Sequence, residues 1–206
     1  MNETETKDGR RARRSANRER IARAFLELVR SGESEPGTRV IAERAGVSPR
    51  TVFRCFEDME ALYRELTAAV RAEFLPRAVL DLNTTDRGER LDRLLANRTD
   101  MFGDMEPFRF ASEAYRHRYA SLEDDHDFLV RMERERLRVV LNPDGAIDDD
   151  TFEALTAVTS FEFWRRLRVD QGLSKIAAAR VMSMTARAVF AIPGRLLPVA
   201  DEGGIR

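Results

Sequence analysis

Hydrophobic residues recur along most of the chain at the three- and four-residue spacing of an α-helix. One apolar stripe of this kind is formed by Ile21, Ala24, Phe25, Leu28 and Val29. Gly32 follows as a helix stop. No segment alternates polar and apolar residues between turn residues, as a half-buried strand would. The pattern therefore predicts an all-α protein, and the lack of a recurring unit of about 20–50 residues argues against a helical solenoid.

Two short helices follow the first stripe, separated by a tight turn. The first is predicted to begin at Thr38, a good N-cap residue, and to end at Gly46. The second begins at Ser48, a preferred N-cap, with Pro49 on the first helical position. Two helices joined by a glycine-containing turn are typical of a helix-turn-helix. An ordinary helical hairpin inside a bundle has the same local pattern, so both interpretations stay open at this point.

The rest of the chain indicates longer helices with recognisable ends. In order, the pattern predicts a helix from Asp58 to Pro76, segments around 91–95, 101–119 and 128–141, a long helix over 148–170 and a last helix over 174–192. Asp148 and Ser174 are the expected N-caps of the last two helices, and Gly172 is the stop between them.

The composition of the 206 residues excludes several classes of protein. No stretch approaches the roughly 18 uninterrupted apolar residues of a membrane span, and no apolar block follows the charged N-terminus as in a secretory signal. We therefore expect a cytoplasmic protein without membrane association. The only cysteine, Cys55, can form neither an internal disulfide nor a multi-thiolate zinc site.

Charge is distributed unevenly along the chain. Residues 9–54 contain twelve arginines and five glutamates, a net charge of +7, whereas residues 55–206 have a net charge of −6. A basic first quarter before an acidic remainder is expected when one end of a protein binds a polyanion, although a solvated surface of mixed sign would also accommodate it.

The second short helix has the composition of a groove-reading helix. A helix about 10–12 Å across fills the major groove of DNA, where base edges are distinguishable. The four-residue spacing of Val52 and Phe56 turns both inward. The residues left available to a groove are Pro49, Arg50, Phe53 and Arg54.

The run from Ile41 to Phe56, followed by Glu60-Ala61-Leu62, resembles the DNA-binding head of the TetR family of bacterial transcriptional regulators. The resemblance covers about residues 18–66. It implies an N-terminal three-helix head with a helix-turn-helix, followed by a larger helical bundle for ligand binding and dimerisation. The expected limits are a disordered basic arm over 1–14, the head over 15–62, the bundle over 63–198 and a tail over 199–206.

The resemblance also implies a set of DNA-binding residues. Thr38 would cap the first motif helix against a phosphate, and Arg39 would reach a base. The full expected set is Thr38, Arg39, Ser48, Pro49, Arg50, Thr51, Phe53, Arg54 and Cys55. The family often has Tyr at position 53, Tyr or His at position 55 and Lys at position 59, so Phe53, Cys55 and Met59 each lack a polar contact to the phosphate backbone.

Four arginines in the predicted arm could replace the contacts that these departures remove. They are Arg10, Arg11, Arg13 and Arg14. We expect them to touch phosphates or an adjacent minor groove, with a solvated tail as the alternative.

The acidic remainder is expected to dimerise and to bind a ligand. The helices predicted over 148–170 and 174–192 correspond to the pair that forms a four-helix dimer bundle in TetR-like proteins. Family resemblance implies an effector cavity among the middle helices, where methionine and aromatic residues would suit an apolar compound. The expected ligand-binding residues, for which plain core packing is the alternative, are Phe102, Met105, Phe108, Tyr115, Phe161 and Trp164.

No cofactor or metal site is expected. His126 lies beside three aspartates, but a solvated acidic helix start explains that cluster better than a metal site.

Together these features predict a homodimeric repressor that binds a palindromic operator in double-stranded DNA and is released by a small apolar effector. One alternative is a regulator of the same fold controlled by a protein partner or by no effector. A helical enzyme or lipid carrier is the other, and no phosphate loop, nucleophile motif or histidine pair supports it.

Overall fold

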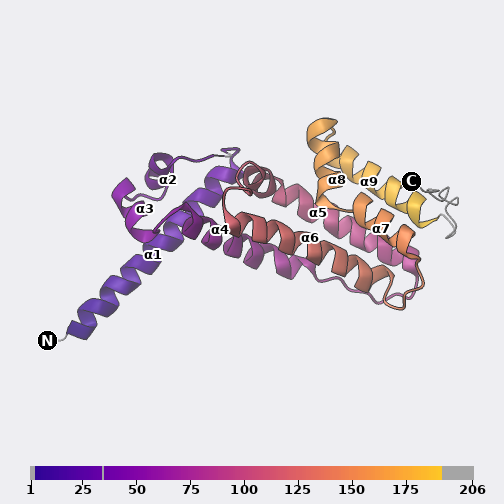
Figure 1. The fold of residues 1–206 in the computed structure, drawn as a ribbon, viewed down its shortest axis with the longest axis horizontal. Helices are drawn as coiled ribbons and strands as arrows, with labels where there is room; N and C mark the ends of the chain where they lie inside the picture. The colour runs from indigo at the N-terminus through magenta and orange to yellow at the C-terminus, as the bar shows by residue number, and fades with distance from the viewer. Residues whose placement is uncertain (1–2, 34, 192–206) are drawn as a thin grey trace, which may run out of the picture. The chain divides into compact units, whose positions relative to one another are not determined.

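The computed structural model of the chain describes residues 3–33 and 35–191 (Figure 1). Every regular element in this part is helical, which confirms the all-α prediction. The residues divide by contact into two compact units, one of residues 1–79 with 101–130 and one of residues 80–100 with 131–206. Each unit has its own buried residues and is described by itself. The predicted limits of 15–62 and 63–198 stay predictions, and the predicted tail over 199–206 lies outside the described residues.

The first unit begins with the predicted three-helix head. Helices α2 (Thr38–Arg44) and α3 (Pro49–Cys55) both pack on α1 (Glu3–Arg30), and α4 (Met59–Phe74) packs on α1 as well. The helix predicted to open near Asp58 begins at Met59, and Asp58 is its N-cap, accepting from the Ala61 N–H (2.8 Å). The apolar stripe of α1 is buried against the inward residues of α2, α3 and α4. We call this cluster the head core; it includes Ile21, Phe25, Leu28, Val29, Ile41, Val52, Phe56, Leu62 and Leu66.

The prediction of a disordered arm over 1–14 is wrong for residues 3–14, because α1 already begins at Glu3. The segment from residue 3 to 20 contains no proline and one glycine, and it is rich in arginine, glutamate and alanine, which favour helix. The Nε of Arg13 also donates to the carbonyl of Gly9 (3.0 Å). These N-terminal turns extend past α2 and α3 (Figure 1).

Two further helices complete the first unit. After α4 the chain makes a 3₁₀ turn, η1 (Leu75–Ala78), which contains the Pro76 that was expected to end the helix. Helices α5 (Arg87–Glu113) and α6 (Ala120–Leu141) contribute residues 101–130 to this unit. The two segments predicted around 91–95 and 101–119 belong largely to the one helix α5, which continues through Pro107.

The second unit contains the C-terminal helices. They are α7 (Asp149–Val158), α8 (Phe161–Arg165), the π-helical turn η2 (Arg166–Asp170) and α9 (Lys175–Phe190). Asp148 and Ser174 cap α7 and α9, and Gly172 lies between the helices with φ 65°, all as predicted. The last helix ends at Phe190, with Ala191 as its C-cap residue, close to the predicted end at residue 192.

The prediction of one uninterrupted helix over 148–170 is wrong, because α7 ends before Thr159. The Oγ1 of Thr159 accepts from the buried Arg98 and itself donates to the Leu155 carbonyl (2.8 Å). Ser160 then caps α8 by accepting from the Phe163 N–H (3.1 Å), and Glu133 accepts from the Phe161 N–H (3.1 Å). Side chains therefore satisfy the backbone groups that a helix break exposes.

Candidate nucleic-acid interface and cavity

The head contains two short helices joined by a tight turn. Gly46 adopts φ 62° after α2, a left-handed conformation that favours glycine. A Cβ on Gly46 would also come within 3.0 Å of Nη2 of Arg20. Ser48 caps α3 by accepting from the Thr51 N–H (3.2 Å), and Pro49 occupies the first turn. The turn and the start of α3 are therefore fixed by local chemistry.

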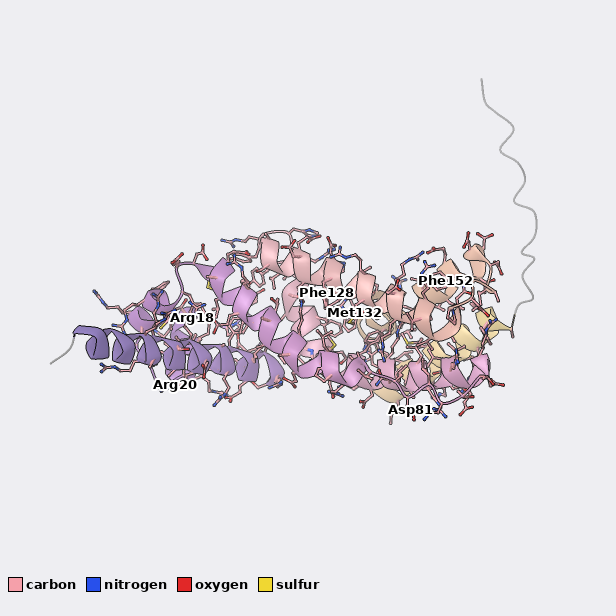
Figure 2. All side chains as sticks on the ribbon, turned by 90° about the horizontal axis from the view of Figure 1, so that it is seen from below. Arg18, Arg20, Asp81, Phe128, Met132 and Phe152 are labelled. Atoms are coloured by element: carbon pink, nitrogen blue, oxygen red, sulfur yellow. The ribbon has the colours of Figure 1, made fainter. Side chains whose placement is uncertain are left out.

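Two arginines of α1 hold this motif in place, and both are labelled in Figure 2. Arg20 donates to the carbonyls of Ala45 (2.7 Å) and Gly46 (3.2 Å), the two residues of the turn. Arg18 donates to the Cys55 carbonyl (2.8 Å) at the end of α3 and pairs with Glu65 of α4 (2.5 Å). These side chains fix α3 against α1, a role that the sequence analysis missed.

The predicted groove-facing residues lie on the solvent side of α3. Phe53 is 68% exposed and presents its ring on this side of the helix. Val52 and Phe56 are buried in the head core, as their spacing predicted. The residues of the expected DNA set that are exposed are Arg39, Ser48, Pro49, Arg50, Phe53 and Arg54, and Thr38 and Thr51 are half-buried.

Two expectations about this set need correction. Cys55 is 1% exposed in the head core, so its side chain does not face a groove; it falls on the inward stripe three residues after Val52. Thr38 is the first helical residue of α2 and not its cap, because Gly37 holds the N-cap position and makes no side-chain bond. The α2 N–H groups therefore lack a side-chain acceptor there and suit an anion, as helix N-termini do.

Further exposed positive charge lies on α1. Arg11, Arg13 and Arg14 are all exposed on the turns that extend past α2 and α3, while the side chain of Arg10 lies outside the described residues. Exposed guanidinium groups can neutralise phosphates along a duplex. A short polar helix held rigidly on a basic support has the features needed to read DNA.

Comparison with known proteins identifies this head. A family model described as bacterial regulatory proteins of the tetR family matches residues 28–66, which span α2, the turn, α3 and the first half of α4. The head is therefore similar to the DNA-binding heads of that family, and the chain is a DNA-binding regulator of transcription with a helix-turn-helix.

The likeness to a known fold extends beyond the matched head. A solved structure of a transcriptional regulator from Rhodococcus sp. Rha1 superposes with a TM-score of 0.64 and 17% sequence identity, covering 84% of this chain and 95% of that one. At this identity the likeness concerns the fold. No curated protein matches the chain. Within the described residues, no helix combines the length and apolar character needed to cross a membrane.

A cavity of about 60 Å³ lies inside the first unit. Helices α1, α4, α5 and α6 all contribute to its wall. Of the six predicted ligand-binding residues, Met105 and Phe108 line it. The other apolar lining residues include Phe25, Val29, Leu66, Val70, Leu122 and Leu129.

The other four predicted ligand-binding residues are not part of this wall. Phe102 is buried, and Phe161 and Trp164 are buried in the second unit, where core packing accounts for them. Tyr115 lies in a cluster of all three tyrosines of the chain, with Tyr63 at 6.4 Å and Tyr119 at 6.4 Å between ring centroids. Burial raises the pKa of Tyr63 to about 12.

The cavity wall has polar groups at Asp125 and Arg109. Arg71 donates to the Asp125 carboxylate (2.5 Å) and stacks its guanidinium 4.1 Å from the ring centroid of Phe128, which is labelled in Figure 2. Burial raises the pKa of Asp125, and the hydrogen bond from Arg71 opposes that shift. Arg109 is buried and has an interaction partner of its own.

Proposed function

We propose that this TetR-family regulator is a homodimeric repressor that binds a palindromic operator and is released from it by a small effector. The observation that carries the proposal is the exposure of Arg50, Phe53 and Arg54 on a short helix fixed at both ends. One such helix spans only a few base pairs, so useful discrimination calls for two copies related by a twofold axis. The chain then acts by binding, without catalysis.

Dimerisation is supported by an apolar surface on α9. Ile176 and Met184 are 80% and 63% exposed, and they lie eight residues apart, on one face of the helix. Ala188 continues that face and is also exposed. Large exposed apolar side chains next to a small residue allow close packing against a second copy. A homodimer would bury this face and supply the second head.

Release by an effector follows from linkage. A ligand that prefers a conformation with the wrong position of the heads lowers operator affinity by the ratio of its affinities for the two conformations. The cavity of the first unit supports such a site because α1, a helix of the head, forms part of its wall. Control by a protein partner is the alternative, and it predicts that no small molecule binds in this cavity.

The operator-binding surface is tested by fluorescence anisotropy with DNA selected from a random pool. Arg50→Ala is expected to weaken binding by about 1–3 kcal/mol, the value of a bidentate contact between arginine and guanine. Arg138→Ala is the matched control, since Arg138 is an exposed arginine of α6 in the second unit that pairs with Glu135 (3.8 Å) and lies 4.8 Å from the ring centroid of Phe152. Equal affinities of the two variants would contradict the proposed interface.

The contribution of the N-terminal turns of α1 is tested separately by salt dependence. Each phosphate contact adds about 0.9 to the slope of log affinity against log salt concentration. Exchange of Arg11, Arg13 and Arg14 for glutamine keeps the helix and removes three exposed charges. The slope is expected to become less steep, and an unchanged slope would show that these turns do not touch DNA.

A further inference from the structure

Helix α3 exposes a large apolar side chain on its outward face. Phe53 is 68% exposed, whereas Val52 and Phe56 are 4% and 3% exposed in the head core. Within the described residues, the Phe53 ring neither packs on another aromatic ring nor lies under a cation. The ring is therefore available to a second molecule.

Two arginines without a partner flank this ring. Arg50 lies three residues before Phe53, so the two side chains share one face of α3, with Cβ atoms roughly 5–6 Å apart. Arg54 directly follows Phe53, and both arginines are exposed. In the part of the chain that the structure describes, neither forms an ion pair or a hydrogen bond. Their charges are therefore free to attract the phosphates of a duplex to this face.

The chemistry of the Phe53 ring limits what it can contact on DNA. A phenyl ring has no hydroxyl, so it cannot donate a hydrogen bond to a phosphate oxygen. The major groove also presents an apolar group, the methyl at C5 of thymine, and phenylalanine is one of the side chains that contact it. The partner that suits an exposed phenyl ring on a groove-reading helix is therefore a pyrimidine C5-methyl group.

The C5-methyl group is shared by two bases. Thymine and 5-methylcytosine have it at the same ring position and differ at C4, where thymine has a carbonyl oxygen and cytosine an amino group. Distinguishing an acceptor from a donor at C4 requires a side chain that forms hydrogen bonds. Because Phe53 forms none, its contact would favour both methylated bases equally over uracil and unmethylated cytosine.

Arg50 adds a second requirement at the neighbouring base pair. Arginine binds guanine through two hydrogen bonds, to O6 and N7. Successive bases of one strand are about 3.4 Å apart along the helix axis, so two side chains roughly 5–6 Å apart at Cβ can reach adjacent base pairs. A methylated pyrimidine in the base pair next to a guanine would satisfy both side chains.

We propose that Phe53 and Arg50 together read a C5-methylated pyrimidine next to a guanine, so that operator affinity responds to C5 methylation of cytosine. This inference rests on the proposed function, because it concerns the same surface of α3. It adds that a cytosine at this position makes a weak operator, and that methylation of the cytosine strengthens it.

The test changes one methyl group at a time in an operator selected from a random pool. The guanine read by Arg50 is the position at which Arg50→Ala loses its base preference. Each flanking base pair is then made in four forms, with thymine or uracil opposite adenine and with 5-methylcytosine or cytosine opposite guanine. At one flanking pair, the methyl group is expected to lower the Kd about fourfold in both contexts, the value of burying one methyl group.

Two variants separate a contact with the ring from an effect of the methyl group on DNA shape. Phe53→Ala should bind the methylated and unmethylated duplexes equally, because the ring is gone. Val79→Ala removes another exposed apolar side chain of the first unit, outside α1 to α4, and should keep the fourfold difference. A methyl effect of the same size in Phe53→Ala would overturn the assignment to Phe53.

The remaining outcomes distinguish this inference from the proposed function. If methylation left the Kd of the unaltered chain equal or raised it, while Arg50→Ala still weakened binding, the inference would fail and the proposed function would stand. A gain from the thymine methyl but none from the methyl of 5-methylcytosine would overturn the claim that the ring reads the methyl group alone. Selection of no DNA sequence would refute the proposed function and this inference with it.

Discussion

Replacing Arg98 by methionine is expected to destabilise the second unit strongly. Arg98 is 2% exposed, and its guanidinium donates to the carbonyl of Thr159 (2.9 Å), to Oγ1 of Thr159 and to the carbonyl of Glu133. Burial lowers the pKa of Arg98 to about 10, so the side chain is still charged at neutral pH. Methionine would remove the charge, keep most of the volume and leave these acceptors without their donor.

The expected loss is about 3–5 kcal/mol, the usual cost of removing one partner of a buried charged network. For a chain of this length it corresponds to a fall in Tm of roughly 6–20 °C. Thermal unfolding followed by fluorescence is suited to the measurement, because Trp164 is the only tryptophan and is buried in the same unit.

Arg93→Met is the matched control on the same helix. Arg93 forms a partly exposed i,i+4 ion pair with Glu89 (2.6 Å) and donates to the exposed Asp81 carbonyl (2.9 Å), so its loss should cost no more than about 1 kcal/mol. If Arg98→Met unfolded at the same temperature as the unaltered chain, the break between α7 and α8 would not depend on Arg98, and the reasoning from buried acceptors would be refuted.

Three further predictions concern the first unit. Ser48→Ala should cost about 1 kcal/mol of stability and also weaken operator binding. Ser160→Ala removes an equivalent cap in the second unit and should lower stability alone. Equal operator affinities of the two variants would contradict the role of the α3 cap. If Phe53 contacts a thymine methyl, replacing thymine by uracil in the selected operator weakens binding by the unaltered chain but not by Phe53→Ala, whose Tm should be unchanged. The same loss of affinity in the variant would exclude the contact. The pKa of Tyr63 is about 12 in the folded chain and about 10 when unfolded, so the free energy of unfolding should fall as the pH rises from 10 to 12. Urea titrations should show a smaller fall for Tyr63→Phe. The same dependence of stability on pH in both chains would contradict the burial of the Tyr63 hydroxyl.

The helix-turn-helix was predictable because its determinants are local in sequence. Gly46 supplies the left-handed turn residue, and Ser48 and Pro49 fix the start of α3 within three residues. The inward stripe of Val52 and Phe56 follows from helical spacing alone. That stripe also passes through position 55, so a stricter reading of the spacing would have placed Cys55 in the core.

The supports of the motif were not predictable in the same way. Arg18 and Arg20 bond to backbone carbonyls 37 and 25 residues away, and an arginine in a basic segment carries no local sign of such partners. Arg98 likewise has partners 35 and 61 residues distant. The break at Thr159 depends on those contacts, which explains why helical periodicity predicted one continuous helix.

The cavity shows a different limit of sequence reasoning. Aromatic and methionine residues gather in cores and in cavities alike, so their density could not separate Met105 and Phe108, which line the cavity, from Phe161 and Trp164, which fill a core. The contribution of Phe25 depends on how α1 packs on three other helices. No sequence pattern describes that packing.

Selection of DNA from a random pool by the purified chain tests the central claim most directly. The account predicts enrichment of an inverted repeat with half-sites about 10 base pairs, one helical turn, or a multiple of it apart, bound as a dimer and lost on Arg50→Ala. Enrichment of no sequence, or of a single asymmetric site bound equally well by Arg50→Ala, would contradict it.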